Sequence, residues 1–355
     1  MSKLGELLRD TVRRGGSDLH FFAGEPPRMR HDGTLATVSG QTALTADDVQ
    51  AELDAIMPET ARVEFAERDG TDFAYSAEGI GRFRVNVLRH FAGAGAVFRS
   101  IPDRILPLDA LGMPEVLASF CRQRNGLVLV TGKTGSGKST TLAAMLDAIN
   151  QERKAHIVTI EDPIEFIHAR KRSLISQREV GRHAPAFATA LRSALREDPD
   201  VIMVGELRDL ETIQLAVTAA EMGILILATL HTSNASSTID RLVNTFPEKQ
   251  QAQVRNMLST SLQAIVSQQL VPRTDGGRVA AVEVLINSHA VGNIIREGKT
   301  DQLDGVMRSG ALVGMTTMDA SLQRLVDGGL ITPQEAWAAA VDKTRFSGAA
   351  GKISG

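Results

Sequence analysis

One stretch decides the fold: residues 126–150, which read GLVLVTGKTGSGKSTTLAAMLDAIN. The apolar run over 126–131 predicts a buried strand, and residues 139–150 have the pattern of a helix. Between them, residues 132–139 match the phosphate-binding pattern G-x-x-x-x-G-K-[ST] in full. A strand, a glycine-rich loop and a helix in this order predict a nucleoside triphosphate site in an α/β domain.

The loop has a physical reason for each residue type. Glycines let the backbone curl so that its N–H groups face phosphate oxygens, and the helix N-terminus adds a partial positive charge. We expect Lys138 to reach the β- and γ-phosphates of ATP and Ser139 to bind Mg²⁺. The predicted nucleotide contacts are Thr134, Gly135, Ser136, Gly137, Lys138, Ser139 and Thr140. A chance glycine-rich turn is the alternative, and the flanking strand and helix argue against it.

Strands and helices alternate beyond the loop. Helical patterns at 185–197 and 209–222 lie among short apolar runs at 156–160, 201–204 and 224–230. Such alternation predicts a mostly parallel sheet with helices on both faces. After residue 250 we expect helices, a hairpin around 275–277, and further helices to Ala340.

Polar side chains stand where three of these strands end. Glu161 and Asp162 follow one strand, Glu206 follows another, and His231 follows the third. Ligands of open α/β sheets bind at the carboxyl ends of the strands. Any one of these residues could be a solvated strand end or a helix cap, but together beside a phosphate loop they predict a site. A phosphate-loop enzyme needs such an acidic strand end to hold the metal and orient the attacking water, and both Glu161–Asp162 and Glu206 are candidates.

His231 has three possible roles: a core histidine, a metal ligand or a member of the site. No set of cysteine, histidine and aspartate residues with ligand spacing surrounds it, which argues against zinc. We therefore interpret His231 as a sensor that hydrogen-bonds the γ-phosphate region, its water or an acidic neighbour.

The residues before the loop predict a separate domain. Leucines on one face of residues 3–14 indicate an amphipathic helix. Within strand-like residues 71–100, Arg84 alternates with apolar neighbours and projects away from the predicted core. We place a first domain at 1–100, a linker at 101–114, the ATPase domain with C-terminal helices at 115–345, and a Gly/Ala/Ser-rich tail, expected to be disordered, at 346–355.

Composition bounds the function. The 355 residues suggest about two domains, and the net charge of −3 gives no support to a nucleic-acid motor, so no nucleic-acid partner is expected. The single cysteine, Cys121, excludes an internal disulfide framework. No signal-peptide pattern or membrane-length apolar segment occurs. We expect a cytoplasmic protein.

Four motifs, taken together, resemble a known family. GKTGSGKSTT at 132–141, TIEDPIEF at 159–166, REDPDVIMVGELRD at 196–209 and ATLHT at 228–232 are similar to the Walker A, aspartate-box, Walker B and histidine-box motifs of the bacterial type II/IV secretion ATPases. Within that superfamily the chain is most similar to the type IV pilus retraction ATPases, and the resemblance runs from Leu4 to about Trp337.

The resemblance implies an ATP-hydrolysing homohexamer. Each subunit would have an N-terminal PAS-like α/β domain and a C-terminal RecA-like domain with a helical extension, with ATP between the domains. By position, Glu161 matches the glutamate proposed to activate water, and Glu206 matches the Walker B glutamate, which with Ser139 would hold Mg²⁺ directly or through water. His231 matches the histidine-box residue, and Arg84 and Arg99 match arginines that approach the nucleotide.

The implied function is type IV pilus retraction and twitching motility. It would take ATP and Mg²⁺, act on an inner-membrane platform protein at the cytoplasmic base of the pilus, and could involve a paralogous pilus ATPase. One alternative is pilus extension or type II secretion, whose ATPases usually carry a longer N-terminal region and a four-cysteine zinc insertion. Another is an accessory retraction ATPase that depends on its paralogue. Gly292, in AVGNIIRE at 290–297, replaces an arginine of the family's AIRNLIRE retraction motif.

Overall fold

The computed structural model describes residues 2–31, 33–101 and 104–352. The chain forms two compact units. The first comprises Met1–Arg104 and Pro163–Ile167, and the second comprises Ile105–Asp162 and His168–Gly355. The short segment Pro163–Ile167 includes the second half of the predicted aspartate box, and nothing in its sequence indicates that it packs with the N-terminal part. The linker at 101–114 stays our proposal for the domain boundary.

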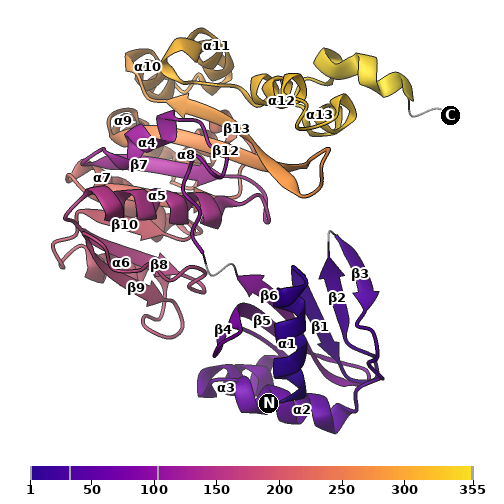
Figure 1. The fold of residues 1–355 in the computed structure, drawn as a ribbon. Coiled ribbons are helices and arrows are strands. Elements are labelled where there is room, and N and C mark those ends of the chain that lie inside the picture. Colours follow the sequence, from indigo (N-terminus) through magenta and orange to yellow (C-terminus); the bar gives the residue numbers. More distant parts are fainter. Residues whose placement is uncertain (1, 32, 102–103, 353–355) are drawn as a thin grey trace. The chain divides into compact units, whose positions relative to one another are not determined.

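A six-stranded antiparallel sheet organises the first unit. Its strand order is β3-β2-β1-β6-β5-β4. The strands are β1 (Asp18–Phe22), β2 (Arg28–His31), β3 (Thr34–Thr37), β4 (Gly70–Ala77), β5 (Gly81–His90) and β6 (Gly93–Ile101). The helices are α1 (Lys3–Arg13), α2 (Ala46–Ile56) and α3 (Glu59–Arg68) (Figure 1).

Only one face of this sheet carries the core. Phe83, Val85 and Phe98 are fully buried in the same cluster as the apolar sides of the three helices. Side chains alternate along a strand, so Arg84 and Arg99 lie on the other face. The two arginines are paired across β5 and β6. The alternation predicted for residues 83–87 is therefore confirmed.

The second unit contains a seven-stranded sheet in the order β13-β12-β7-β11-β10-β8-β9. All neighbouring pairs are parallel except β12 with β13, so the predicted mostly parallel sheet is confirmed. The strands are β7 (Gly126–Thr131), β8 (His156–Glu161), β9 (Leu174–Glu179), β10 (Val201–Val204), β11 (Leu225–Leu230), β12 (Leu262–Pro272) and β13 (Arg278–Ile286).

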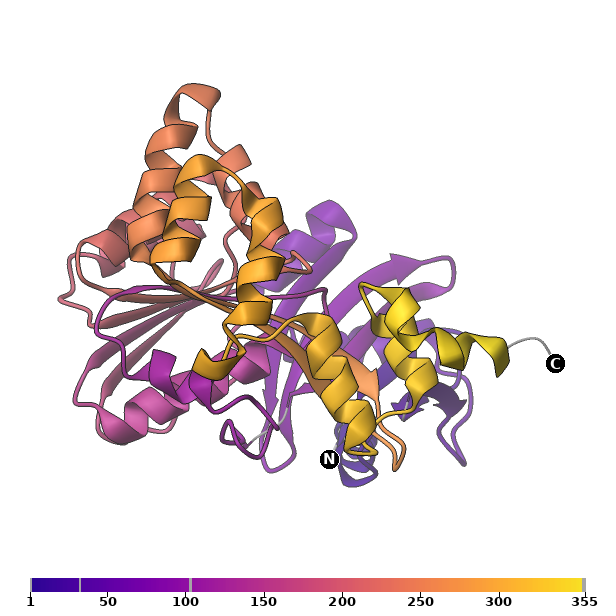
Figure 2. The same ribbon diagram turned by 90° about the horizontal axis from the view of Figure 1, so that it is seen from above.

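Helices cover both faces of this sheet. Along β7, Val128 and Val130 pack toward α4 and α5, while Leu127 and Leu129 join the opposite cluster with α6 to α11. In Figure 2 the magenta helices lie on one side of the sheet and the orange ones on the other. The helices are α4 (Val116–Cys121), α5 (Lys138–Glu152), α6 (Phe187–Ala194), α7 (Leu210–Glu221), α8 (Ala235–Asn244), α9 (Glu248–Ser261), α10 (His289–Glu297) and α11 (Leu303–Ser309).

The chain ends in helices that pack on the β12–β13 hairpin. They are α12 (Met318–Asp327), α13 (Pro333–Ala339) and the 3-10 helix η3 (Lys343–Lys352). We expected residues 346–355 to be disordered, but the structure has η3 continuing to Lys352. Phe346 is buried in a cluster with Met318 and Leu322, and burial of this ring anchors the segment. Residues 353–355 lie outside the described residues.

No helix in the described part of the chain has the length and apolar character that crossing a membrane requires.

The buried cysteine gives a first prediction. Cys121 is 3% exposed, and burial raises the pKa of its thiol to about 12. Because the thiolate is the reactive form, a thiol reagent at neutral pH is expected to modify no cysteine in the native protein and one in denaturant. Ellman's reagent measures this difference. Rapid modification of native Cys121 would contradict its burial at the C-terminal end of α4.

Candidate nucleotide site

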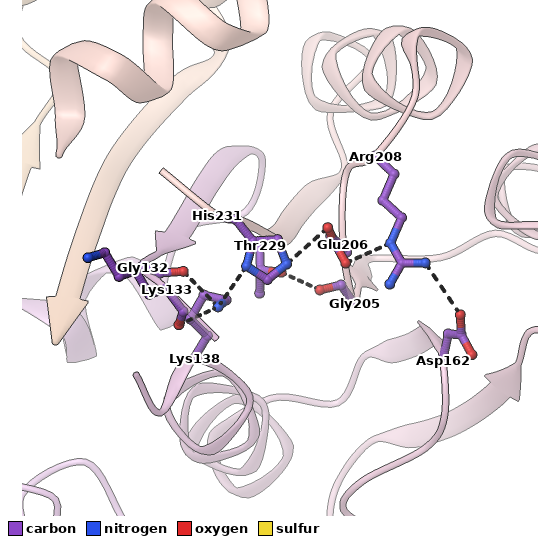
Figure 3. Close-up of polar contacts among 9 residues, drawn as sticks. All are labelled: Gly132, Lys133, Lys138, Asp162, Gly205, Glu206, Arg208, Thr229 and His231. Carbon is purple, nitrogen blue, oxygen red and sulfur yellow. Dashed lines mark hydrogen bonds and ion pairs between the residues drawn. The ribbon is translucent and has the colours of Figure 1, made fainter. Parts of the chain in front are cut away.

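The strand order brings the predicted polar residues to one edge of the sheet. β11 lies between β7 and β10, and all three strands are parallel. The phosphate loop begins after β7, His231 follows β11, and Glu206 follows β10. The histidine is therefore placed between the loop lysine and the glutamate. Thr229 Oγ1 donates to the carbonyl of Gly205 and ties the ends of β11 and β10 together (Figure 3).

The loop requires glycine at its first turn. Gly132 has a φ of 145°, and a Cβ atom there would lie 2.3 Å from the carbonyl oxygen of Gln268. Gly137 has a φ of 90° and immediately precedes the first residue of α5. Both positions exclude larger residues because of strain and crowding. The curled backbone predicted for a phosphate cradle is thus present.

Lys138 is fixed against the loop that it serves. Its side chain is buried, and Nζ donates to the carbonyl oxygens of Gly132 at 2.8 Å and Lys133 at 3.1 Å. Beside it, the hydroxyl of Ser136 is buried and has no hydrogen-bond partner among the described residues. An ammonium and an orphaned hydroxyl donor at a helix N-terminus fit the oxygens of a bound phosphate.

His231 bridges the lysine and the Walker B glutamate. Its Nδ1 lies 3.5 Å from Lys138 Nζ, and its Nε2 lies 3.0 Å from Glu206 Oε1 (Figure 3). A lysine ammonium only donates, so Nδ1 must accept and Nε2 carries the proton that faces the carboxylate. Neutral histidine satisfies both contacts. Of the three contacts expected of His231, the structure shows the one with an acidic neighbour, and its role as a sensor stays a prediction.

Glu206 is held as a carboxylate. Arg208 Nε donates to its Oε2 at 2.7 Å, and the guanidinium also lies 3.7 Å from Asp162 Oδ2. Burial by itself would raise the pKa of Glu206, but hydrogen bonds from Arg208 and His231, together with the positive charge of Arg208, outweigh it, so the pKa lies below its ordinary value. An ionised Glu206 can accept a proton from a metal-bound or attacking water.

Glu161 ends the next strand, β8, and has its own partners. It is buried, and its Oε1 accepts hydrogen bonds from Thr159 Oγ1 at 2.6 Å and Gln177 Nε2 at 3.2 Å. These bonds fix the direction of the carboxylate. The edge of the sheet therefore carries two carboxylates, Glu161 and Glu206, whose directions are set by hydrogen bonds, and both are candidates for holding water.

Removal of the histidine side chain is expected to slow turnover more than it weakens binding. His231 contacts Lys138 and Glu206 but is not part of the phosphate loop. The His231→Ala variant should lose about tenfold to a hundredfold in kcat, as is common for residues that orient the primary groups of a site. Its affinity for a fluorescent ADP analogue should stay within about twofold of wild type. Weakened binding with unchanged kcat would speak against the sensor role.

The lowered pKa of Glu206 makes a prediction about pH. A carboxyl whose pKa is depressed by folding stabilises the protein above its unfolded pKa, and this contribution is lost as the pH falls through the folded pKa. The free energy of unfolding of wild type should exceed that of Glu206→Gln near neutral pH, and the difference should shrink below about pH 4.3. Urea unfolding of both proteins across this range measures it. A pH-independent difference would contradict the charged network.

The other predicted residues are placed as follows. Ser139 and Thr140 lie in the first turn of α5, and Thr134 and Gly135 are exposed on the loop. Their contacts with nucleotide and metal stay predictions. Arg84 and Arg99 lie side by side on the first unit, where Arg84 is near Asp72 at 3.7 Å and Arg99 binds Asp18 at 3.0 Å. Their action on the nucleotide also stays a prediction.

Two side chains that contact the site residues, Arg208 and Gln268, were not predicted from the sequence. Arg208 lies within the quoted Walker B stretch, but nothing in the sequence shows that it binds Glu206. Gln268 is buried on β12, donates to the carbonyl of Ser136 at 2.6 Å, and accepts from Thr141 at 2.9 Å. A clue was available, because polar residues in the otherwise apolar run 262–272 need partners.

A parallel sheet with a phosphate loop at its carboxyl edge, a buried lysine and oriented carboxylates defines a P-loop ATPase of RecA-like architecture. A family model described as "Type II/IV secretion system protein" matches residues 2–327. The chain belongs to this family of ATPases, as its four motifs indicate.

Individual relatives agree with this assignment. The chain is 51% identical over 331 residues to the type IV pilus retraction ATPase PilT of Pseudomonas aeruginosa, covering 93% of this chain and 96% of the relative. It is 49% identical over 331 residues to a twitching motility protein of Neisseria gonorrhoeae, covering 93% and 88%. A crystal structure of the pilus retraction motor PilT with bound ADP superposes with a TM-score of 0.89 at 45% identity, covering 97% and 99%.

Proposed function

We propose that this chain is a hexameric motor that uses ATP hydrolysis to power type IV pilus retraction. The observation that carries the proposal is near full-length similarity to a retraction ATPase, joined to an intact phosphate loop and acidic edge. Pilus extension and type II secretion are less well supported, because the chain has a single cysteine and therefore no four-cysteine zinc insertion.

Each residue of the site has a proposed role in ATP hydrolysis that follows from its position. Bound Mg-ATP supplies the γ-phosphoryl group, and the metal neutralises part of its charge. Lys138 binds the phosphates, while Ser139 and Glu206 would hold the metal or its water. Glu161 or Glu206 orients the attacking water and accepts its proton. Arg84 and Arg99 would add positive charge to the transferred group, which is worth about 10³–10⁵-fold in rate for arginine fingers.

The proposed partners follow from the family. A ring of six copies would turn cycles of nucleotide binding into movement of an inner-membrane platform protein and so withdraw pilin subunits. In this proposal the protein acts in the cytoplasm, peripheral to the inner membrane at the base of the pilus. No nucleic acid is part of the proposal.

One local feature favours a second candidate, an accessory ATPase that depends on a paralogous pilus ATPase. Gly292 stands on α10 where the retraction motif carries arginine. A Cβ atom there would lie 3.1 Å from the carbonyl oxygen of Ser259, so α10 packs closely on the last turn of α9. A larger residue would have to displace that turn. Purified protein that hydrolyses ATP only when the paralogue is added would favour this second candidate.

Deletion of the gene tests the primary proposal. Cells without the protein should be hyperpiliated and lose twitching. The wild-type gene should restore normal pilus number and twitching, whereas the gene for Glu206→Gln should restore neither. Normal pilus number and motility in a strain that also lacks any paralogue would overturn the retraction proposal while leaving the ATPase assignment intact.

A further inference from the structure

The side chain of Gln177 hydrogen-bonds both the carboxylate of Glu161 and the backbone of His168. It lies on the edge strand β9 directly beside Thr159 of β8. Since side chains alternate, Thr159, Glu161 and Gln177 share the face of the sheet that α5 covers. Gln177 Nε2 donates to Glu161 Oε1 at 3.2 Å, and Gln177 Oε1 accepts from the main-chain N–H of His168 at 2.9 Å.

The second bond fixes the orientation of the amide. A main-chain N–H only donates, so the oxygen of Gln177 must face His168. The NH₂ group is then left to face the carboxylate of Glu161. One rigid, planar amide therefore joins the carboxylate to the backbone, and a shift of His168 is passed to Glu161 through a side chain with both ends occupied.

His168 is the first residue after the segment that packs with the N-terminal unit. That segment, Pro163–Ile167, belongs to the first unit, whereas Glu161, His168 and Gln177 belong to the second. Within the first unit, Arg82 donates to the carbonyl oxygens of Ile164 at 3.1 Å and Glu165 at 3.2 Å. The backbone therefore connects the segment that Arg82 binds directly to the N–H that donates to Gln177.

A separate set of bonds anchors the chain after His168. Asn150 of α5 donates to the carbonyl of Ala169 at 2.7 Å and accepts from the N–H groups of Lys171 and Ser173. Lys171 Nζ also binds Asp147 at 2.7 Å. This anchoring does not involve Gln177, so the loop keeps its place when that amide is removed, and the effect of its loss on Glu161 can be measured alone.

We propose that Gln177 is a positioning residue that couples the Pro163–Ile167 segment, and with it the N-terminal unit, to the direction of the Glu161 carboxylate. The inference rests on the proposed function in taking Glu161 as a carboxylate that orients the attacking water. When the segment moves, the amide turns Glu161 toward or away from its working direction. Hydrolysis is thereby made conditional on the state of the N-terminal unit.

Two variants separate the two ends of the amide. Gln177→Ala removes both bonds. Gln177→Glu keeps an acceptor for His168 N–H but removes the donor to Glu161. Both should lower kcat by about tenfold to a hundredfold, with the affinity for a fluorescent ADP analogue within about twofold of wild type and the melting temperature nearly unchanged. Only Gln177→Ala should speed hydrogen exchange at the His168 amide.

Ser176→Ala is the matched control on the same strand. Its hydroxyl points to the opposite face and contacts His156 Nε2 at 3.3 Å, so kcat should stay at the wild-type value. Wild-type kcat in Gln177→Glu would overturn the inference, as would unchanged His168 exchange in Gln177→Ala. If Gln177→Ala folds poorly, the kcat of Gln177→Glu alone tests the inference. Failure of the proposed function looks different, because Glu161→Gln would then keep full ATPase activity.

Discussion

Lys138→Met is expected to abolish ATP hydrolysis, with a fall in kcat/KM of about 10³-fold or more. The ammonium is buried at the start of α5, within hydrogen-bond distance of two loop carbonyls and near His231. Methionine has a similar length but no charge, so neither the ground-state phosphates nor the charge that grows on the transferred group would be stabilised. A coupled ATPase assay and binding of a fluorescent ADP analogue measure the two effects.

Lys133→Met is the matched control for this variant. Lys133 lies in the same loop, but its side chain is exposed and only its backbone carbonyl contacts Lys138. The same change of charge there should leave most of the activity. Equal losses in both variants would mean that the loop needs general positive charge, which would contradict a specific role for Lys138.

Glu206→Gln is expected to lower kcat by about 10²–10⁴-fold and to leave nucleotide affinity nearly unchanged. Glutamine keeps the shape of the side chain but cannot accept a proton from water. The substitution also removes the carboxylate charge that lies 2.7 Å from Arg208 Nε and 3.0 Å from His231 Nε2. Glu161→Gln should give a loss of similar size if Glu161 accepts the proton, and a smaller one if Glu206 does. Single-turnover hydrolysis therefore assigns the division of labour between them.

Glu211→Gln is a suitable control, because Glu211 is an exposed glutamate near the start of α7 that pairs only with Arg192 among the described residues. Exposed pairs contribute about 0–1 kcal/mol, so little should change. Full activity in both Glu206→Gln and Glu161→Gln would mean that the water is oriented from elsewhere and would refute the acidic site.

Local patterns predicted the central elements closely. The strands expected at 126–131 and 201–204 occur at those residues, because an apolar run buried between two helical layers has few alternative structures. The hairpin expected around 275–277 is also present, and Gly276 and Gly277 both have positive φ. Each of these features is specified by neighbouring residues alone.

Features that depend on distant partners were missed or expected differently. β9 is a partly exposed edge strand, LISQRE, without an apolar run, so only its pairing with β8 defines it. Residues 346–355 were expected to be disordered because they are rich in glycine, alanine and serine, but η3 continues to Lys352 and Phe346 packs against α12. Gln177 and Gln268 looked like ordinary polar residues until their partners were brought close by the fold.

The sequence by itself determined the phosphate loop, the acidic strand ends and the family, because each depends on residues that are close together in the chain. The tertiary structure alone decided which side chains His231 contacts. Along the chain β10 comes between β7 and β11, yet in the sheet β11 lies between β7 and β10. Strand order results from the packing of helices on both faces and cannot be seen in local periodicity. It places His231 between Lys138 and Glu206, and so makes a histidine at the end of an apolar run part of the nucleotide site.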